Sequence, residues 1–172
     1  MRYPMRLAQG RRAPADRARE TALSERGRIA GIDFGTKRIG IATADLETRI
    51  AFPHEVYARQ NPAADAEYFR RLVREERLCR FVVGLPIHLN GRESQKSFQA
   101  RQFGDWLGQA TGLGVEFFDE RFTSAEAESM LLEAELTKRQ RQARIDKLAA
   151  QIMLAAYLES GGHSEPPAAL DD

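Results

Sequence analysis

The chain has 172 residues, of which 42% are hydrophobic and 30% are charged, a composition typical of an ordinary soluble globular domain. No stretch approaches the roughly 20 consecutive apolar residues of a membrane-spanning helix, so a helical membrane protein is excluded. The formal net charge is only +1, but residues 1–28 contain eight arginines and three carboxylates. Because local clusters of basic residues attract a polyanion even when the total charge is near zero, a nucleic-acid partner remains open.

Cysteine occurs once, at Cys79, which excludes an internal disulfide and a thiolate metal cage. This usage fits a reducing cytoplasm, and we expect a cytoplasmic protein in which Cys79 is a buried, inert thiol rather than a nucleophile.

The N-terminal segment, residues 1–27, is rich in arginine and lacks aliphatic periodicity. We expect a flexible, solvated extension that touches nucleic acid. An organelle transit peptide is the alternative, but three carboxylates together with Pro4 and Pro14 argue against it.

A predicted hairpin follows this extension. Two apolar, β-branched runs, residues 29–34 and 39–44, flank the turn segment 35–38. Asp33 interrupts the first run one residue before its end, and a charge among such neighbours needs a compensating cation or metal ion. Asp33 is therefore the leading candidate for function, with hydrogen bonding to nearby backbone groups as its alternative.

The following elements alternate between strands and helices. We expect a strand at 51–58 that is entered through Pro53, and a helix that ends at Arg77 with Ala66, Phe69, Leu72 and Val73 at helical spacing. A buried strand over residues 80–86 comes next. Strand, helix and strand at this spacing predict a parallel crossover.

The second half continues the alternation after a loop at 87–93. A helix presents Phe103, Trp106 and Leu107 inward and ends at Gly112, and a strand covers 115–118. Thr123 and Glu126 form a capping box for a further helix. Residues 136–144 read as an exposed basic loop, residues 145–159 as the final helix, and residues 161–172 as a disordered acidic tail.

These elements predict an α/β domain over residues 28–160, in which a five-stranded mixed sheet carries helices on both faces. Ligand chemistry in such sheets gathers at the strand ends. Three carboxylates occupy such positions: Asp33 near the end of the first strand, Glu120 after the last strand, and Asp146 at the start of the last helix.

Oxygen ligands without His or Cys companions suit Mg²⁺ or Mn²⁺, and carboxylates of this kind can hold two metal ions for phosphodiester hydrolysis. Each acid also has a structural alternative, because Glu120 can pair with Arg121 and Asp146 can interact with the helix dipole. Phosphate contacts beside the site are expected from basic residues near these acids, namely Lys37, Arg38, Arg121, Lys138, Arg139, Arg141 and Arg144.

Four segments resemble successive signatures of the YqgF family, also called RuvX. They are residues 33–42, residues 83–86 with Gly91, residues 119–123 and residues 145–158. Ile145 and Phe122 are conservative departures from the usual Val and Leu, and residues 1–27 lie outside the resemblance. The resemblance implies a ribonuclease H-like fold and a nuclease that matures the 5′ end of precursor 16S ribosomal RNA in the bacterial cytoplasm.

The resemblance also assigns the metal-binding and catalytic roles to Asp33, Glu120 and Asp146. Older descriptions of the family give a Holliday junction resolvase, so branched DNA is the second substrate expected. The nucleic-acid partner is then structured precursor ribosomal RNA, in contact with the ribosome, or a four-way junction. A resolvase generally works as a homodimer, whereas trimming of one RNA end needs only a monomer.

Two rival classes share part of this pattern. ATP-binding phosphotransferases of the actin and sugar-kinase type also begin with an Asp-x-Gly-Thr hairpin, as at residues 33–36, but they need two such domains to enclose a nucleotide. A noncatalytic RNA-binding or ribosome-assembly factor would keep the fold and the basic residues without turnover. Divalent-metal binding at the three acids separates this reading from a nuclease.

Overall fold

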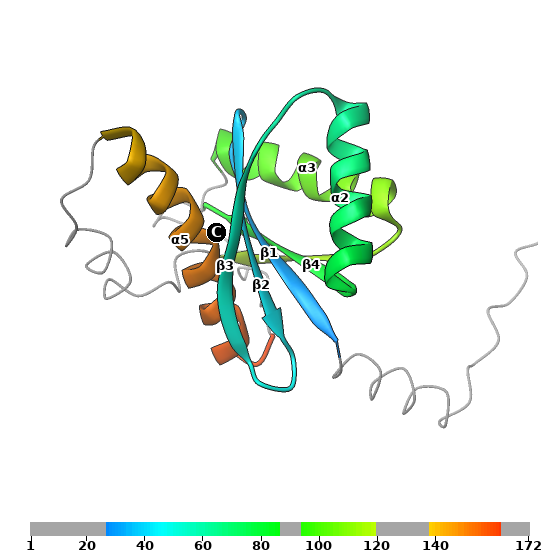
Figure 1. Ribbon diagram of the computed structural model, residues 1–172, viewed down its shortest axis with the longest axis vertical. Coiled ribbons are helices and arrows are strands. Elements are labelled where there is room, and N and C mark those ends of the chain that lie inside the picture. The colour runs from blue at the N-terminus through cyan, green and yellow to red at the C-terminus, as the bar shows by residue number, and fades with distance from the viewer. Residues whose placement is uncertain (1–26, 87–93, 120–137, 163–172) are drawn as a thin grey trace, which may run out of the picture.

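The computed structural model describes residues 27–86, 94–119 and 138–162, with side chains of the last range described from Leu148 onward. Within these ranges the chain forms a five-stranded sheet in the order β3-β2-β1-β4-β5 (Figure 1). The strands are β1 (Arg28–Phe34), β2 (Arg38–Asp45), β3 (Ile50–Ala58), β4 (Leu78–Leu85) and β5 (Gly114–Asp119). The expected five-stranded mixed sheet is confirmed.

The direction of the strands brings the ends of β1 and β5 to one edge. β1 pairs antiparallel with β2, and β2 pairs antiparallel with β3. On its other side β1 pairs parallel with β4, which pairs parallel with β5. The expectation that the carboxyl ends of β1 and β5 share an edge of the sheet is therefore confirmed.

The β3 strand forms an edge of this sheet and contains Pro53, which cannot donate a ladder hydrogen bond. Pro53 lies opposite Ala42, where the register between β2 and β3 shifts. This shift in register, on an edge strand, accommodates Pro53, which an inner strand would not tolerate.

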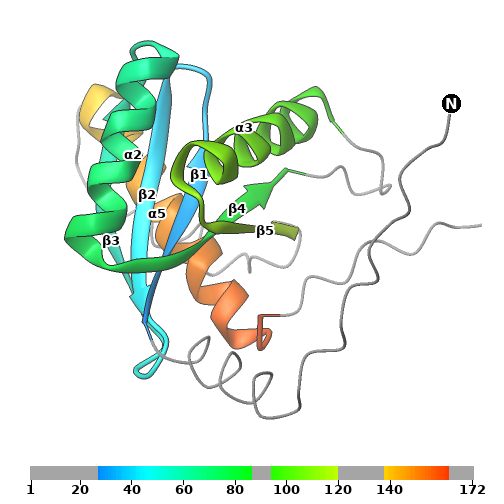
Figure 2. The same ribbon diagram turned by 90° about the vertical axis from the view of Figure 1, so that its right-hand side faces the viewer.

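Two helices, α2 (Pro62–Glu76) and α3 (Gln95–Thr111), cover one face of the sheet (Figure 2). The Asn61 side chain caps α2 by accepting a hydrogen bond from the Ala64 amide, and Ser94 caps α3 in the same way through Ser97. α2 ends at Arg77, in the left-handed conformation with φ 51°, and α3 ends at Gly112 with φ 76°.

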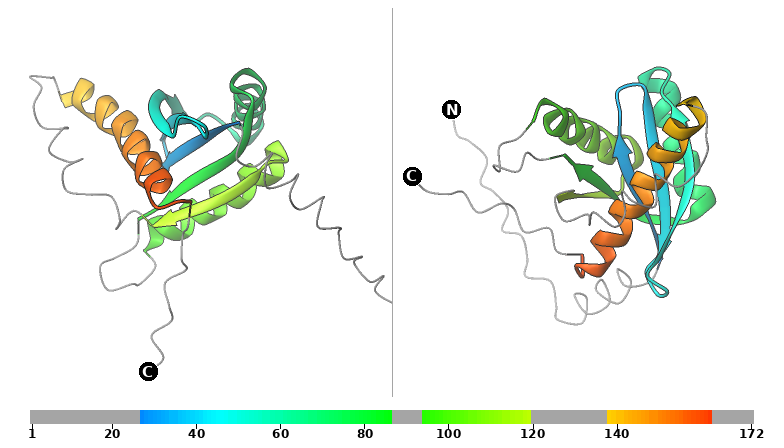
Figure 3. Two further views of the ribbon diagram at one scale, coloured as in Figure 1. Left: turned by 90° about the horizontal axis from the view of Figure 1, so that it is seen from below. Right: turned by 90° about the vertical axis from the view of Figure 1, so that its left-hand side faces the viewer.

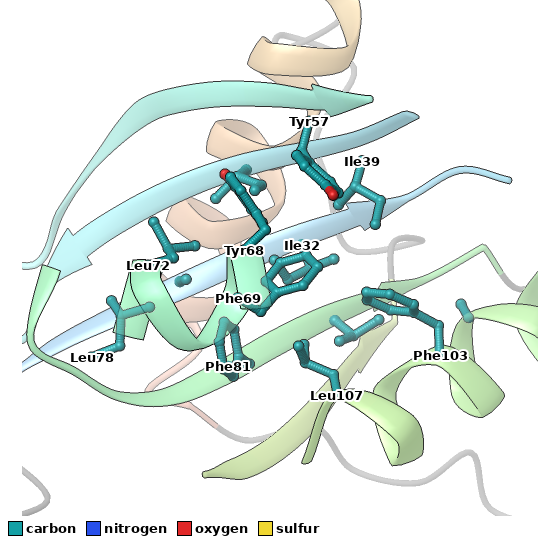
Figure 4. Close-up of a cluster of buried hydrophobic side chains, with 14 of the residues drawn as sticks. Ile32, Ile39, Tyr57, Tyr68, Phe69, Leu72, Leu78, Phe81, Phe103 and Leu107 are labelled. Carbon is teal, nitrogen blue, oxygen red and sulfur yellow. The ribbon is translucent and has the colours of Figure 1, made fainter. Parts of the chain in front are cut away.

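Aromatic rings fill the core between these helices and the sheet (Figure 4). Phe69 of α2 is fully buried, and its ring makes edge contacts with Phe81 of β4 and with Phe103 and Trp106 of α3. The predicted inward positions of both helices are thus confirmed for Phe69, Phe103 and Leu107.

The opposite face is covered by α5 (Lys138–Glu159), which packs mainly across β1, β2 and β3 (Figure 3). Its buried side chains follow the helical repeat and are Ala150, Met153, Leu154, Tyr157 and Leu158. The helix approaches β1 most closely at Gly31, where an added Cβ would lie 2.8 Å from the Leu154 Cβ.

The prediction of an exposed basic loop before this helix is wrong for residues 138–144, which form the first turns of α5. These residues lack an apolar stripe, so periodicity alone gave no helix. Lys, Arg and Gln are nevertheless strong helix formers, so intrinsic propensity favours a helix in this segment.

Other expectations fall partly or wholly outside the described residues. They are the extension 1–27, the loop 87–93, the helix begun by Thr123 and Glu126, and the tail beyond Gly162. Cys79 is half-buried rather than buried and packs against the core under α5. In the described ranges, none of the helices combines the length and the apolar character needed to cross a bilayer.

Candidate active site

The centre of the candidate site is the end of β1 and the turn that follows it. Successive side chains of a strand point to opposite faces of the sheet. Ile32 and Phe34 belong to the core under α2 and α3, whereas Gly31 contacts α5. Asp33 therefore lies on the α5 face, with its neighbour Phe34 on the other.

A hollow of about 500 Å³ surrounds the turn, and it is lined by Asp33, Phe34, Gly35, Thr36, Lys37, Arg38 and Gly40. Asp33 is half-buried, while Lys37 and Arg38 are exposed. The hollow thus combines one carboxylate with two cations, an arrangement that can hold a phosphate group or a metal ion together with its anionic ligand.

Gly35 gives the turn its tight form. A Cβ at this position would overlap the carbonyl oxygen of Arg38, so any side chain would force the turn open. The glycine therefore fixes how closely the cations follow Asp33.

A second hollow, of about 330 Å³, adjoins the first on the α2 and α3 side. Its lining residues are Phe34, Thr36, Arg59, Pro62, Gln99, Gln102, Phe103 and Trp106. Phe34 and Thr36 line both hollows. Sequence reasoning treated Phe103 and Trp106 as core residues only and assigned no role to Arg59, whose position just before the Asn61-Pro62 break carried no recognisable signal.

Arg59 is held in place by a buried network at the start of α2. Asp65, only 1% exposed, forms an ion pair of 3.3 Å with the Arg59 Nε and accepts a hydrogen bond of 2.8 Å from the Tyr57 hydroxyl. Burial, with a further contribution from Asp65, raises the pKa of Tyr57 to about 12. Tyr57 therefore stays protonated and acts as a donor in the physiological pH range.

A different polar cluster lies near the C-terminal end of α5. The Tyr157 hydroxyl donates to Glu116, which also forms an ion pair of 3.0 Å with Arg80. Burial raises the pKa of Tyr157 well above its usual range. This cluster ties α5 to β4 and β5, and it includes none of the acids predicted to be catalytic.

The structure brings together three of the predicted site residues, Asp33, Lys37 and Arg38, around the first hollow. Glu120 and Arg121 lie outside the described residues. Asp146 lies on α5, as do the predicted phosphate-binding residues Lys138, Arg139, Arg141 and Arg144, but their side chains are outside the described set.

Among the described side chains, which exclude those of Glu120 and Asp146, no three His, Cys, Asp or Glu residues form a group that could hold a metal ion. Asp33 is the carboxylate that lines the first hollow, and none of the described lining residues is His or Cys. An oxygen donor of this kind fits a hard cation such as Mg²⁺ or Mn²⁺ rather than zinc.

Comparison with known proteins gives the family. A protein from Rhodopirellula baltica named "Putative pre-16S rRNA nuclease" is 42% identical over 141 residues, which are 82% of each chain. A protein of the same name from Syntrophomonas wolfei is 40% identical over 134 residues, or 78% of this chain and 95% of that one.

Among solved structures, that of T. thermophilus RuvC in complex with a Holliday junction substrate is similar, with 16% identity and a TM-score of 0.46 over 78% of this chain and 96% of that chain. The strand order and directions described above are those of the ribonuclease H-like fold expected for the family. Residues 27–160 match the sequence model of the RuvX family, described as Holliday junction resolvase, and the chain belongs to this family.

Proposed function

We propose that this chain is a metal-dependent endonuclease that processes the 5′ end of precursor 16S ribosomal RNA, acting in the cytoplasm on ribosome precursors. Asp33 carries the proposal, because a half-buried carboxylate ends the central strand in a hollow shared with Lys37 and Arg38. The names of the relatives from Rhodopirellula baltica and Syntrophomonas wolfei support the choice of RNA as substrate.

The sheet geometry supports a meeting of Asp33 with Glu120. Ile32 lies beside Val83, and Val83 lies beside Phe117, so β1 and β5 are two strand spacings, or about 10 Å, apart. Asp33 follows Ile32 directly, and Glu120 comes three residues after Phe117. Carboxylates extending from two parallel strand ends at this separation can share a pair of metal ions about 3.5 to 4 Å apart.

The course of α5 supports the third ligand. Asp146 lies four residues before the fully buried Ala150, which is one helical turn or about 6 Å along the axis. Figure 3 shows the N-terminal end of α5 at the same end of the sheet as the turn after β1. Because Asp146 precedes Ala150 in the sequence, it lies toward that end of α5, which supports its inclusion in the proposed site.

Each group then has a defined task. Bound Mg²⁺ or Mn²⁺ would activate the attacking water and stabilise the leaving oxygen. Asp33, Glu120 and Asp146 would hold the ions through carboxylate oxygens. Lys37 and Arg38 would neutralise the phosphates that flank the cleaved bond, as would Arg121 and the cations of the first turns of α5, Lys138, Arg139, Arg141 and Arg144.

Four-way DNA is the second candidate substrate, favoured by the description of the matching family model. Cleavage of a junction requires symmetric cuts by a homodimer, whereas processing of one RNA end is compatible with a monomer. The state of the protein in solution therefore bears on which substrate is the natural one.

The experiment compares the wild-type chain with Asp33→Asn and with Asp105→Asn, a control on the exposed surface of α3. Each protein is incubated with Mn²⁺ and either precursor 16S RNA or a four-way junction, and Mn²⁺ binding is measured by calorimetry. We expect RNA cleavage by the wild type and the control, and loss of cleavage and weaker Mn²⁺ binding in folded Asp33→Asn. Cleavage of the junction alone would identify the second substrate, and RNA binding without any cleavage would indicate an assembly factor.

A further inference from the structure

The hollow between Phe34 and Trp106 has no assigned role in holding metal or phosphate. It lies beside the β1–β2 turn, where the end of β1, the connection from β3 to α2, and the middle of α3 meet. Its volume of about 330 Å³ is at the lower end of the range of ligand sites, roughly 300 to 1,000 Å³. The space suits a single planar group rather than a duplex.

The walls of this hollow provide flat stacking surfaces. The Phe34 and Phe103 rings stack with centroids 4.9 Å apart, and Trp106 lies 5.4 Å from Phe103. The Arg59 guanidinium lies 5.5 Å from the Phe34 centroid and 5.6 Å from that of Phe103, fixed there by Asp65. Aromatic rings and guanidinium planes are the surfaces on which proteins stack unpaired nucleobases.

Two amide side chains at the rim can read the edge of such a base. Gln99 is half-buried and Gln102 is exposed, and both line the hollow. Neither side chain makes a hydrogen bond to another residue of the described ranges. An amide offers two donors and an acceptor, which match the polar edges of nucleobases.

The hollow adjoins the candidate active site. Asp33 and Phe34 are consecutive, so the carboxylate and the aromatic wall lie on opposite faces at one strand end. Thr36 lines both hollows. A nucleotide chain passing over the turn can therefore present a phosphate to Asp33 and Lys37 while the neighbouring base enters the aromatic side.

We propose that the hollow between Phe34 and Trp106 binds one unpaired nucleobase next to the phosphodiester that lies at Asp33. The inference rests on the proposed nuclease function, and it makes the substrate a strand with an unpaired nucleotide beside the cleaved bond. A continuous duplex, whose bases are stacked in the helix, would leave the hollow empty unless a base were flipped out.

The chain contains its own reporter for this site, because Trp106 is the only tryptophan in the sequence. A base that stacks in the hollow will change the fluorescence of Trp106. The titration uses the full chain in metal-free buffer, where no cleavage occurs, and three probes: a short single-stranded RNA, the same RNA with an abasic nucleotide at each position, and its perfect duplex. We expect saturable quenching with the first probe and little change with the other two.

A matched pair of variants locates the effect. Phe34→Leu removes a stacking surface, and base stacking on an aromatic side chain contributes roughly 5- to 150-fold in affinity, so the dissociation constant should rise about tenfold or more. Phe52→Leu is the control, because Phe52 is 56% exposed on β3 and six residues, or about 20 Å, from Ala58 at the other end of that strand. Gln102→Ala should change the preference among the four bases.

The outcomes separate this inference from the proposed activity. Base-dependent quenching without any cleavage in the presence of Mn²⁺ would support the base site and remove the nuclease. Cleavage with equal quenching by intact and abasic RNA, or equal loss of affinity in Phe34→Leu and Phe52→Leu, would overturn the base site and leave the nuclease standing.

Discussion

Replacing Gly31 with Ala tests how tightly α5 is seated on the central strand. A Cβ at Gly31 would lie 2.8 Å from the Leu154 Cβ and 3.2 Å from its Cγ and Cδ1. Leu154 is fully buried and Ala150, one turn away, is fully buried as well. The position of a Cβ is fixed by the backbone, so the new methyl group cannot avoid Leu154 by changing rotamer. The substitution must therefore push α5 away from β1.

The magnitude follows from two opposing contributions. Overpacking of a core costs about 1 to 3 kcal/mol. Replacing glycine inside a strand by alanine gains about 0.5 to 1 kcal/mol because the unfolded chain loses entropy. We therefore expect Gly31→Ala to lower the free energy of unfolding by about 1 to 2 kcal/mol. Gly114→Ala is the matched control in β5, where an added Cβ meets no atom within 4 Å, and it should be neutral or stabilising.

A double-mutant cycle with Leu154→Ala tests whether the side chains at positions 31 and 154 compete for the same space. Leu154→Ala alone should cost about 2 to 5 kcal/mol because it leaves a cavity. In the double variant the new methyl occupies part of that space, so the combined cost should be smaller than the sum by at least about 0.5 kcal/mol. Urea unfolding monitored by circular dichroism measures all four species. Additive costs, or equal stability of Gly31→Ala and Gly114→Ala, would show that the contact does not limit the position of α5.

Three further outcomes are expected. Lys37→Ala should weaken RNA binding and reduce the slope of log K against log salt by about 1, whereas Arg71→Ala, a control on the exposed surface of α2, should leave the slope unchanged. Asp65→Ala should lower the free energy of unfolding by about 3 to 5 kcal/mol, because it leaves the Tyr57 hydroxyl and the Arg59 guanidinium without the carboxylate that pairs with both. A loss under about 1 kcal/mol in urea unfolding would contradict this. The pKa of Tyr57 is raised from 10.0 to about 12, so its contribution to stability is complete below pH 10.0 and is lost as pH rises through 12. Phenolate absorbance should accordingly appear together with loss of helical circular dichroism, and Tyr57→Phe should reduce the steepness of that loss; a phenolate signal in the still-folded protein would contradict the assignment.

The parts of the fold with strong local signals were predictable. The β1–β2 hairpin follows from two β-branched runs around Gly35, and a helix over residues 145–159 follows from apolar residues at helical spacing. Both signals depend on a need to bury apolar residues. The buried face of α5 was predicted wrongly: Leu148, Ala149, Ile152 and Ala156 were expected inward but are half-buried, and the buried residues are Ala150, Met153, Leu154, Tyr157 and Leu158. Where burial does not decide, as in the basic residues 138–144 at the start of α5, periodicity gave the wrong structure and intrinsic helix propensity would have given the right one.

The candidate site was predictable only in part. Asp33 was identified because a charge in an apolar strand needs an explanation. Glu120 and Asp146 were selected from their places after the last strand and at the start of the last helix, the family resemblance supports their roles, and both remain predictions. The aromatic hollow escaped sequence reasoning because its walls come from the end of β1, the residue after β3, and α3. Phe34, Arg59 and Trp106 carry no common pattern, and only the packing of three elements brings them together.

The position of α5 also determines the order in which the two cores can form during synthesis. This helix covers strands that are synthesised about a hundred residues earlier: Gln151 donates to the Ala51 carbonyl, a separation of 100 residues, and Arg49 donates to the Leu158 carbonyl, a separation of 109. A nascent chain can therefore complete the aromatic core with α2 and α3 while Ile29, Ala42 and Ala44 still face water. The second core closes only after residue 158 has been synthesised, because Leu154, Tyr157 and Leu158 belong to it.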